Sequence, residues 1–161
     1  MTPFEQKLCP SESLTARVAC VPRPLVMTNG VFDLLHRGHV SYLAQARALG
    51  SSLLVAVNTD ASARRLRKGP GQPLNTCDDR MAILAALEST TLITCFHEDT
   101  AAQVLERVRP DIYVKGGDYS AQSTAEGRLA QQLGIAVLSV EVVHARSTSA
   151  IINRIRSLYF R

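Results

Sequence analysis

The sequence lacks tryptophan, has few aromatic residues and contains no apolar run long enough to cross a membrane. Phe and Tyr make up 5% of the 161 residues, and no cluster of aromatic and basic residues typical of RNA-binding sheets is present. A spanning helix needs about 20 apolar residues, and residues 1–10 lack the apolar core of a signal peptide. We therefore expect a cytoplasmic protein with neither a membrane nor nucleic acid as its partner.

Cysteine is also sparse. The four cysteines, Cys9, Cys20, Cys77 and Cys95, are unevenly spaced and form no CxxC pair. This spacing argues against a zinc site or a disulfide framework and favours reduced thiols. We expect no metal site built from protein side chains.

The residues that are present suit one folded domain. The hydrophobic fraction is 46%, and 161 residues can bury a core large enough to fold alone. The net charge of +4 is compatible with a phosphorylated ligand. The densest basic cluster lies within residues 64–68, and it is either a solvated helix face or a phosphate-binding segment.

Apolar runs and helical patterns alternate along the chain. Strands are predicted at residues 25–28, 53–57, 92–96, 112–114 and 135–140. Helices are predicted at residues 40–49, 61–66, 78–87, about 99–108 with Asp99 or Thr100 as the cap, 123–133 and 147–158. Strict alternation predicts an α/β fold with a five-stranded parallel sheet and helices on both faces. Residues 1–24 are expected to form an N-terminal helical extension.

The first motif lies in residues 29–39, directly after the first expected strand. His36 and His39 are three residues apart, with Gly38 between them at the expected start of a helix. This spacing puts both imidazoles on one side of the turn, and Gly38 allows a ligand to approach the backbone. The N–H groups of the helix N-terminus add an anion site. The motif therefore predicts donors aimed at phosphate oxygens, as nucleotidyl transfer requires.

The same segment resembles the signature of the cytidylyltransferase-like nucleotidyltransferases, which share the HxGH element. The matching residues are Gly30, Phe32, Asp33, His36, Gly38 and His39. The resemblance implies a single Rossmann-like nucleotidyltransferase domain in residues 25–161. It also implies that the two histidines contact the triphosphate and stabilise the transition state, and that Asp33 orders its loop or contacts substrate.

Later motifs look like those of the heptose 1-phosphate adenylyltransferases of bacterial ADP-heptose synthesis. They lie at residues 57–60, 64–69, 73–75, 79–81, 114–119 and 147–149. This likeness covers roughly residues 25–155. It implies transfer of AMP from ATP to D-glycero-β-D-manno-heptose 1-phosphate for lipopolysaccharide core biosynthesis, with Mg²⁺ carried by the triphosphate and small molecules as partners.

Residue chemistry extends the candidate site beyond the first motif. Lys68 adjoins a Gly/Pro-rich loop that can close, and Arg80 offers a planar charged fork for phosphate oxygens. The candidate catalytic residues are His36, His39, Lys68 and Arg80. The candidate nucleotide-binding residues are Thr28, Asn29, Gly30, Val31, Phe32, His36, Gly38, His39, Lys115, Gly116, Gly117, Asp118, Ser147 and Thr148. Asp33 and Asp60 are the candidate substrate-binding residues.

Several of these residues have an ordinary structural alternative. Arg80 has possible ion-pair partners in Asp78, Asp79 and Glu88. Ser147 and Asp60 are also suited to capping the helices that they precede.

The chain departs from the family pattern at three positions. Gln72 stands where a basic residue is expected before the proline, which weakens a phosphate role there, and Val31 and Ser149 replace the usual cysteine and threonine. Residues 142–145 lack the Arg-Thr-Glu-Gly run of the glycerol-phosphate and choline-phosphate cytidylyltransferases. That absence favours the heptose branch.

Other functions remain open from the sequence. One is cytidylyl transfer to glycerol 3-phosphate or a similar phosphate ester on the same fold. Another is a non-catalytic nucleotide-binding module, which would not need both histidines together with Arg80. Basic charge alone suggests an RNA-binding protein, which ranks last. An apolar, Val/Ile-rich surface would support a homo-oligomer.

Overall fold

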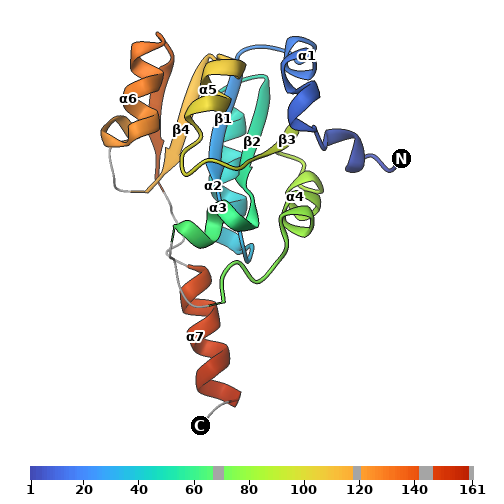
Figure 1. The fold of residues 1–161 in the computed structure, drawn as a ribbon, viewed down its shortest axis with the longest axis vertical. Helices are drawn as coiled ribbons and strands as arrows, with labels where there is room; N and C mark the ends of the chain where they lie inside the picture. The colour runs from blue at the N-terminus through green and yellow to red at the C-terminus, as the bar shows by residue number, and fades with distance from the viewer. Residues whose placement is uncertain (67–70, 118–120, 142–146, 160–161) are drawn as a thin grey trace.

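A computed structural model describes residues 1–66, 71–117, 121–141 and 147–159. Its five strands form one sheet in the order β3-β2-β1-β4-β5 (Figure 1), and every neighbouring pair is parallel. The strands are β1 (Leu25–Gly30), β2 (Ser52–Asn58), β3 (Leu92–Phe96), β4 (Ile112–Gly116) and β5 (Ala136–Val140). The predicted five-stranded parallel α/β sheet is confirmed.

Helices lie on both faces of the sheet. The α-helices are α1 (Leu14–Ala19), α2 (Arg37–Ala48), α3 (Asp60–Arg65), α4 (Cys77–Ala85), α5 (Ala102–Val108), α6 (Ala125–Gln132) and α7 (Thr148–Tyr159). Short 3₁₀ helices are η1 (Glu5–Lys7), η2 (Ser11–Ser13) and η3 (Ala121–Ser123). None of the helices in the described residues is long and apolar enough to cross a membrane.

Each face of the sheet has its own hydrophobic cluster. On one face, α1, α5 and α6 pack on side chains such as Met27 and Leu54. On the other face, α2 and α4 pack on the alternate side chains, such as Val26 and Val55. Because successive residues of a strand point to opposite faces, the continuous apolar runs of β1 and β2 supply both clusters.

Most element boundaries lie close to the predicted ones. β3 has the predicted limits, and α2 begins at Arg37 rather than residue 40 because the histidine motif itself forms the first turn. The predicted cap of α5 is wrong, since the N-cap is Ala101 without a side-chain hydrogen bond. The Asp99 carboxylate instead accepts a hydrogen bond from Arg65 Nε at 2.5 Å. Thr124 is the N-cap of α6, so the helix predicted from residue 123 begins at Ala125, and Ser123 belongs to η3.

The N-terminal residues pack as part of the domain. Leu8 forms a parallel bridge to Ile93 in β3, and the Cys9 N–H donates to the Ile93 carbonyl at 2.8 Å. Cys9, Leu14 and Val18 are buried in the cluster that also contains α5. The residues that the sequence suggests as an extension therefore cover the β3 edge and complete one face of the core.

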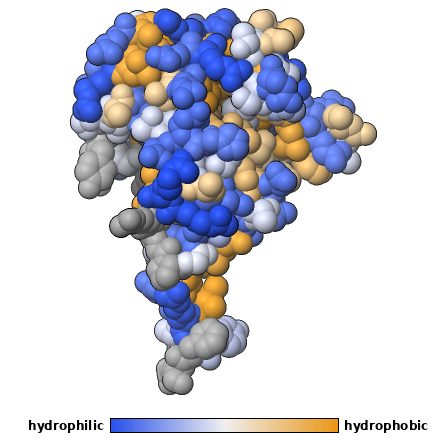
Figure 2. Space-filling model, in the orientation of Figure 1, coloured by the Kyte–Doolittle hydropathy of each residue, from blue (hydrophilic) through white to orange (hydrophobic). Residues whose placement is uncertain are grey.

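Unlike the N-terminal residues, helix α7 does not pack into the core. It projects away from the rest of the domain (Figure 1), and none of its residues is buried. Apolar residues follow one edge of this projection (Figure 2), and Ile155, Leu158 and Tyr159 are 47%, 63% and 76% exposed. The helix is thus amphipathic without a covering surface among the described residues.

Leu14→Ala is expected to lower the free energy of unfolding by about 2–5 kcal/mol, the usual cost of truncating a buried leucine. Leu14 is 1% exposed within the core cluster. Urea denaturation followed by circular dichroism measures the change. Thr15→Ala, at an exposed position of the same helix, is the matched control. A wild-type midpoint for Leu14→Ala would mean that the N-terminal residues contribute little to the core.

Candidate active site

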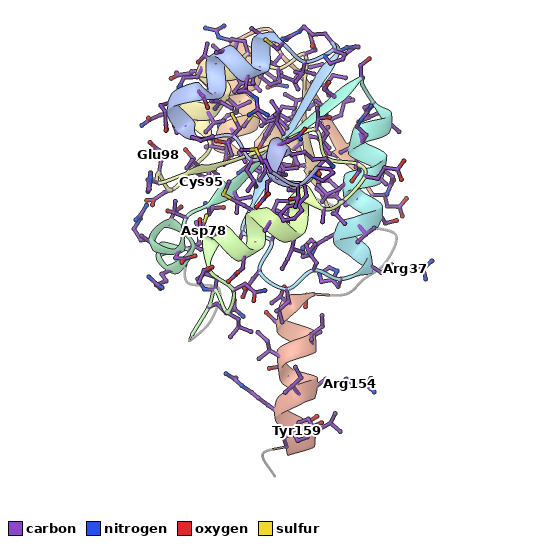
Figure 3. The ribbon with its side chains drawn as sticks, turned by 90° about the vertical axis from the view of Figure 1, so that its right-hand side faces the viewer. Arg37, Asp78, Cys95, Glu98, Arg154 and Tyr159 are labelled. Atoms are coloured by element: carbon purple, nitrogen blue, oxygen red, sulfur yellow. The ribbon has the colours of Figure 1, made fainter. Side chains whose placement is uncertain are left out.

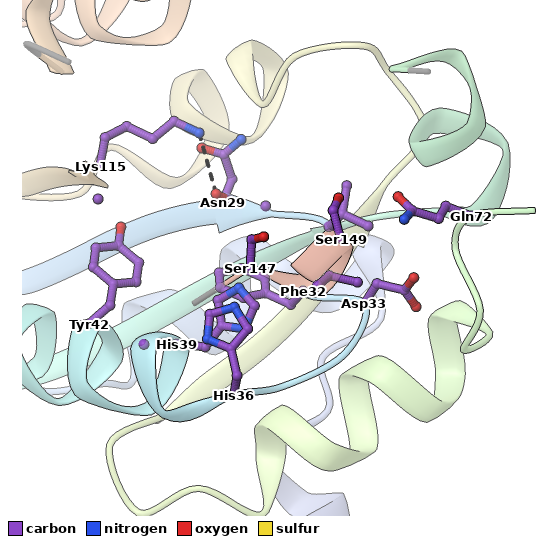
Figure 4. Close-up of a pocket in the computed structure, with 15 residues that line it drawn as sticks. Asn29, Phe32, Asp33, His36, His39, Tyr42, Gln72, Lys115, Ser147 and Ser149 are labelled. Atoms are coloured by element: carbon purple, nitrogen blue, oxygen red, sulfur yellow. Dashed lines mark hydrogen bonds between the residues drawn. The ribbon is translucent and has the colours of Figure 1, made fainter. Parts of the chain in front are cut away.

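A cavity of about 410 Å³ opens at the carboxyl edge of the sheet, beside the ends of β1 and β4. The chain leaves β1 toward β2 and returns to β4 on the other side, so this is the switch point where α/β sheets bind ligands. The cavity is lined by residues from the β1–α2 turn, β4, Gln72 and the start of α7 (Figure 4). They are Asn29, Gly30, Val31, Phe32, Asp33, His36, Gly38, His39, Tyr42, Gln72, Lys115, Gly116, Ser147, Thr148 and Ser149.

The β1–α2 turn brings the histidines into the cavity through an unusual backbone conformation. Phe32 has φ of 50°, in the left-handed region that a bulky side chain rarely adopts. Its ring is buried and meets His39 edge-on, with 5.4 Å between ring centroids. Strain of this kind costs roughly 1–3 kcal/mol and tends to occur at functional sites. The aromatic contact is one interaction that holds the turn in place.

His36 and His39 form a stacked pair at the start of α2. Their ring centroids are 3.9 Å apart and their planes differ by 20°, as the three-residue spacing predicts. His36 is the N-cap of α2, and the His39 N–H donates to its carbonyl at 2.9 Å. The N-terminus of this 12-residue helix carries partial positive charge. Two imidazoles and a helix N-terminus therefore meet in one cavity, which suits a polyphosphate.

Buried tyrosines support the other end of the cavity, where Lys115 lies (Figure 4). The Tyr113 hydroxyl donates to Asn29 Oδ1 at 2.7 Å, and Lys115 Nζ donates to the Asn29 carbonyl at 3.4 Å. Tyr42 lines the cavity and bonds the Thr28 hydroxyl at 2.6 Å. Burial raises the pKa of both tyrosines, so their hydroxyls stay protonated at neutral pH.

Asp33 orders a loop. Its carboxylate accepts backbone N–H bonds from Leu74 and Asn75, each at 2.9 Å, and its carbonyl accepts from Asn75 Nδ2 at 2.9 Å. These bonds hold Leu74 and Asn75 against the β1–α2 turn, and Gln72, two residues before Leu74, lines the cavity. Of the two roles inferred for Asp33, the carboxylate performs loop ordering, while the residue also lines the cavity.

Arg80 was predicted to contact phosphate, but its side chain is buried and does not line the cavity. Its side chain is fully buried and ion-paired with Asp60, with Nη2 and Oδ1 2.8 Å apart. It also donates to the carbonyls of Val31 at 2.6 Å, Asn58 at 2.8 Å and Asn75 at 3.2 Å. These bonds use four of the five guanidinium N–H groups. The expected ion-pair partners Asp78, Asp79 and Glu88 are thus replaced by Asp60, which is distant in sequence.

The structure gathers most of the sequence-predicted residues but not all of them. Thr28, Gly117, Asp60 and Arg80 do not line the cavity. Lys68 and Asp118 lie outside the described residues. Tyr42, Gln72 and Ser149 line the cavity but were not predicted as site residues. Tyr42 follows His39 by three residues on the same helix, a spacing that could have revealed it. Ser147 caps α7 through the Ala150 N–H at 3.1 Å while it also lines the cavity.

Among the described residues, no three or more His, Cys, Asp or Glu side chains come together as a group able to hold a metal ion. Asp33 and Asp60, the two carboxylates predicted for the site, are engaged by backbone N–H groups and by Arg80 respectively. The described part of the cavity presents Lys115, the two imidazoles and the start of α2.

The family profile described as Cytidylyltransferase-like matches residues 27–159. The chain belongs to the cytidylyltransferase-like family. A family relative from Bordetella bronchiseptica, named D-beta-D-heptose 1-phosphate adenylyltransferase, is 50% identical over 155 residues, covering 95% of this chain and 96% of that protein. The bifunctional protein HldE of Azotobacter vinelandii is 49% identical over 132 residues, which are 82% of this chain but 28% of HldE.

Solved structures agree with this cytidylyltransferase-like fold. The crystal structure of the lipopolysaccharide core biosynthesis protein from Thermoplasma volcanium has a TM-score of 0.61 and 31% identity, covering 76% of this chain and 98% of that one. Pantothenate synthetase from Thermus thermophilus has a TM-score of 0.55 at 17% identity, covering 84% of this chain and 61% of that one. The second likeness shows the shared fold alone.

Because Arg80 is buried, its substitution distinguishes a structural role of this side chain from a phosphate-binding role. Arg80→Met is expected to lower the free energy of unfolding by about 3 kcal/mol or more, because buried carbonyls and Asp60 lose their partner. Thermal or urea unfolding measures the loss.

Arg64→Met, at an exposed position of α3, controls for the removal of one positive charge. Wild-type stability of Arg80→Met, combined with lost activity, would instead support the phosphate contact predicted from the sequence.

Proposed function

We propose that this protein transfers AMP from ATP to D-glycero-β-D-manno-heptose 1-phosphate, forming ADP-heptose and pyrophosphate for lipopolysaccharide core biosynthesis. The observation that carries the substrate assignment is the 50% identity, over nearly the whole of both chains, to a protein named as a heptose 1-phosphate adenylyltransferase. The cavity supports the chemistry, because it combines paired imidazoles with a helix N-terminus at the sheet's carboxyl edge.

In the proposed reaction, an oxygen of the sugar phosphate attacks the α-phosphorus of ATP in line and pyrophosphate leaves. The sugar phosphate is already ionised, so no general base is required. The residues act by positioning and by donating hydrogen bonds to oxygens whose charge grows in the transition state. Mg²⁺ enters with the triphosphate as part of the substrate.

We assign His36 and His39 to the oxygens around the reacting phosphorus. Lys115, Gly116, Ser147 and Thr148 line the same cavity and would hold the rest of the nucleotide together with Gly117 and Asp118. Lys68 remains the proposed ligand of the outer phosphates, whereas Arg80 supports the frame of the cavity from within the core.

We place the reaction in the cytoplasm, where ATP is available, and the four free cysteines agree with a reducing compartment. A homo-oligomer also remains a proposal. It is supported by the exposed apolar edge of α7, which contains Ile155 and Leu158.

Cytidylyl transfer is the second candidate, because the matching family is described by that chemistry. Pyrophosphate release with Mg²⁺ and heptose 1-phosphate is expected with ATP and to be at least about tenfold slower with CTP, a difference of about 1.4 kcal/mol in transition-state binding. Omission of the sugar phosphate is the control. Turnover with CTP alone would move the protein to cytidylyl transfer, and nucleotide binding without turnover of any phosphorylated acceptor would favour a non-catalytic module.

His39→Ala is expected to lower kcat by about 10²-fold or more, the effect of losing a donor to transition-state charge. Steady-state pyrophosphate release measures the change. His97→Ala removes an exposed histidine that does not line the cavity and is expected to keep the wild-type rate. If His39→Ala stays within about threefold of wild type, the transition-state role of His39 is wrong.

A further inference from the structure

The strands β1 and β4 separate at the carboxyl edge of the sheet, where the cavity opens. Their pairing ends with Met27 opposite Tyr113. In contrast, the pairing of β1 with β2 continues to Gly30, and that of β4 with β5 continues to Gly116. The ends of β1 and β4 therefore border the cavity, and contacts other than the strand ladder must fix the width of this opening.

One hydroxyl group bridges the opening. The Tyr42 hydroxyl donates to the Val114 carbonyl at 3.1 Å and bonds the Thr28 hydroxyl at 2.6 Å. Thr28 and Val114 are the first residues of β1 and β4 beyond the last paired positions. Because a carbonyl only accepts, the single proton of the Tyr42 hydroxyl goes to Val114, and Thr28 donates to Tyr42. The buried Tyr42 side chain thus connects α2 to both strands at the point where the ladder between them stops.

Tyr42 also lies one turn after the histidine pair. It follows His39 by three residues on α2, so the two side chains lie on one side of the helix. Lys115 directly follows Val114 on β4, and Tyr42, His39 and Lys115 all line the cavity (Figure 4). The bond from Tyr42 to Val114 therefore ties the helix that carries the histidines to the strand that carries Lys115.

We propose that Tyr42 is a positioning residue, whose hydroxyl sets the spacing between the histidine pair on α2 and Lys115 on β4. This inference rests on the proposed function, in which these side chains contact one nucleotide. Removal of the hydroxyl leaves the ring in the core but breaks both bonds, so the histidines shift relative to the nucleotide. Because in-line transfer depends on alignment at the α-phosphorus, a small shift slows the chemical step more than it weakens binding.

Tyr42→Phe is expected to lower kcat for pyrophosphate release by about tenfold or more, while KM for ATP changes by less than about threefold. Steady-state measurements with varied ATP separate the two constants. Tyr159→Phe makes the same chemical change at the far end of α7 (Figure 3), where the side chain is 76% exposed, and is expected to retain wild-type kinetics. A raised KM with unchanged kcat in Tyr42→Phe would overturn the proposal, because the hydroxyl would then act only in binding ATP.

A double variant separates positioning from a loss of stability. Tyr42→Phe leaves the Thr28 hydroxyl buried without its partner, whereas Thr28→Val/Tyr42→Phe removes both hydroxyls. The double variant is expected to regain part of the thermal midpoint lost in Tyr42→Phe but to keep the lowered kcat, because α2 is still not bonded to Val114. Recovery of kcat together with the midpoint would mean that the hydroxyl only stabilises the fold, and the positioning role would be wrong.

Nuclear magnetic resonance of the histidine side chains tests the positioning without substrate. In Tyr42→Phe, the imidazole signals of His36 and His39 are expected to shift or broaden relative to wild type. The signal of His97, an exposed residue that does not line the cavity, is expected to stay in place, and Tyr159→Phe is expected to leave all three signals unchanged. Signals of His36 and His39 that coincide with those of wild type would refute the positioning role.

The two kinds of measurement also separate this inference from the enzymatic assignment. If wild type releases no pyrophosphate from ATP with heptose 1-phosphate, the proposed function fails. The imidazole signals then still decide whether Tyr42 positions the histidine pair.

Discussion

The buried guanidinium of Arg80 connects three segments, one of which, the turn after β1, lines the cavity. It bonds the carbonyl of Val31 after β1, the carbonyl of Asn58 at the end of β2, and the carbonyl of Asn75 in the loop before α4. A buried cation is costly unless it is paired, and Asp60 supplies the paired charge. Because each bond has a fixed direction from a planar group, the three segments are held in one arrangement. Asp33 adds to that frame by binding the N–H groups of Leu74 and Asn75.

Local geometry places the histidine pair beside this frame. The left-handed conformation of Phe32 ends the extended path of β1 and turns the chain toward α2. The helix then presents His36 and His39 as a stacked pair at its positive end. In the proposed reaction, donors that are in place before substrate arrives need little reorganisation as charge develops. The bond from Arg80 to the Val31 carbonyl and the bonds from Leu74 and Asn75 to the Asp33 carboxylate engage the turn that precedes the two histidines.

The two ends of the chain differ in their relation to the core. The N-terminal residues bury Cys9, Leu14 and Val18 against the β3 side of the sheet and close that edge of the domain. At the other end, α7 begins at the cavity through Ser147 and Thr148 but buries none of its own residues. Within the described residues, a bond from the Thr148 hydroxyl to the Leu34 carbonyl at 3.3 Å ties its first turn to the β1–α2 turn.

The sequence by itself determined the features that depend on near neighbours. Alternating apolar runs and helical patterns predicted the parallel sheet, and the three-residue spacing of His36 and His39 predicted their position side by side. Tertiary structure alone decided the partners that are far apart in the chain: Asp60 with Arg80, Asp33 with residues 74–75, and Cys77 with the Asn58 carbonyl. Local periodicity reports which face of an element a residue occupies, but it does not report which distant residue faces it. For that reason the sequence suggested Arg80 as a phosphate ligand, whereas the folded chain buries it away from the cavity lining.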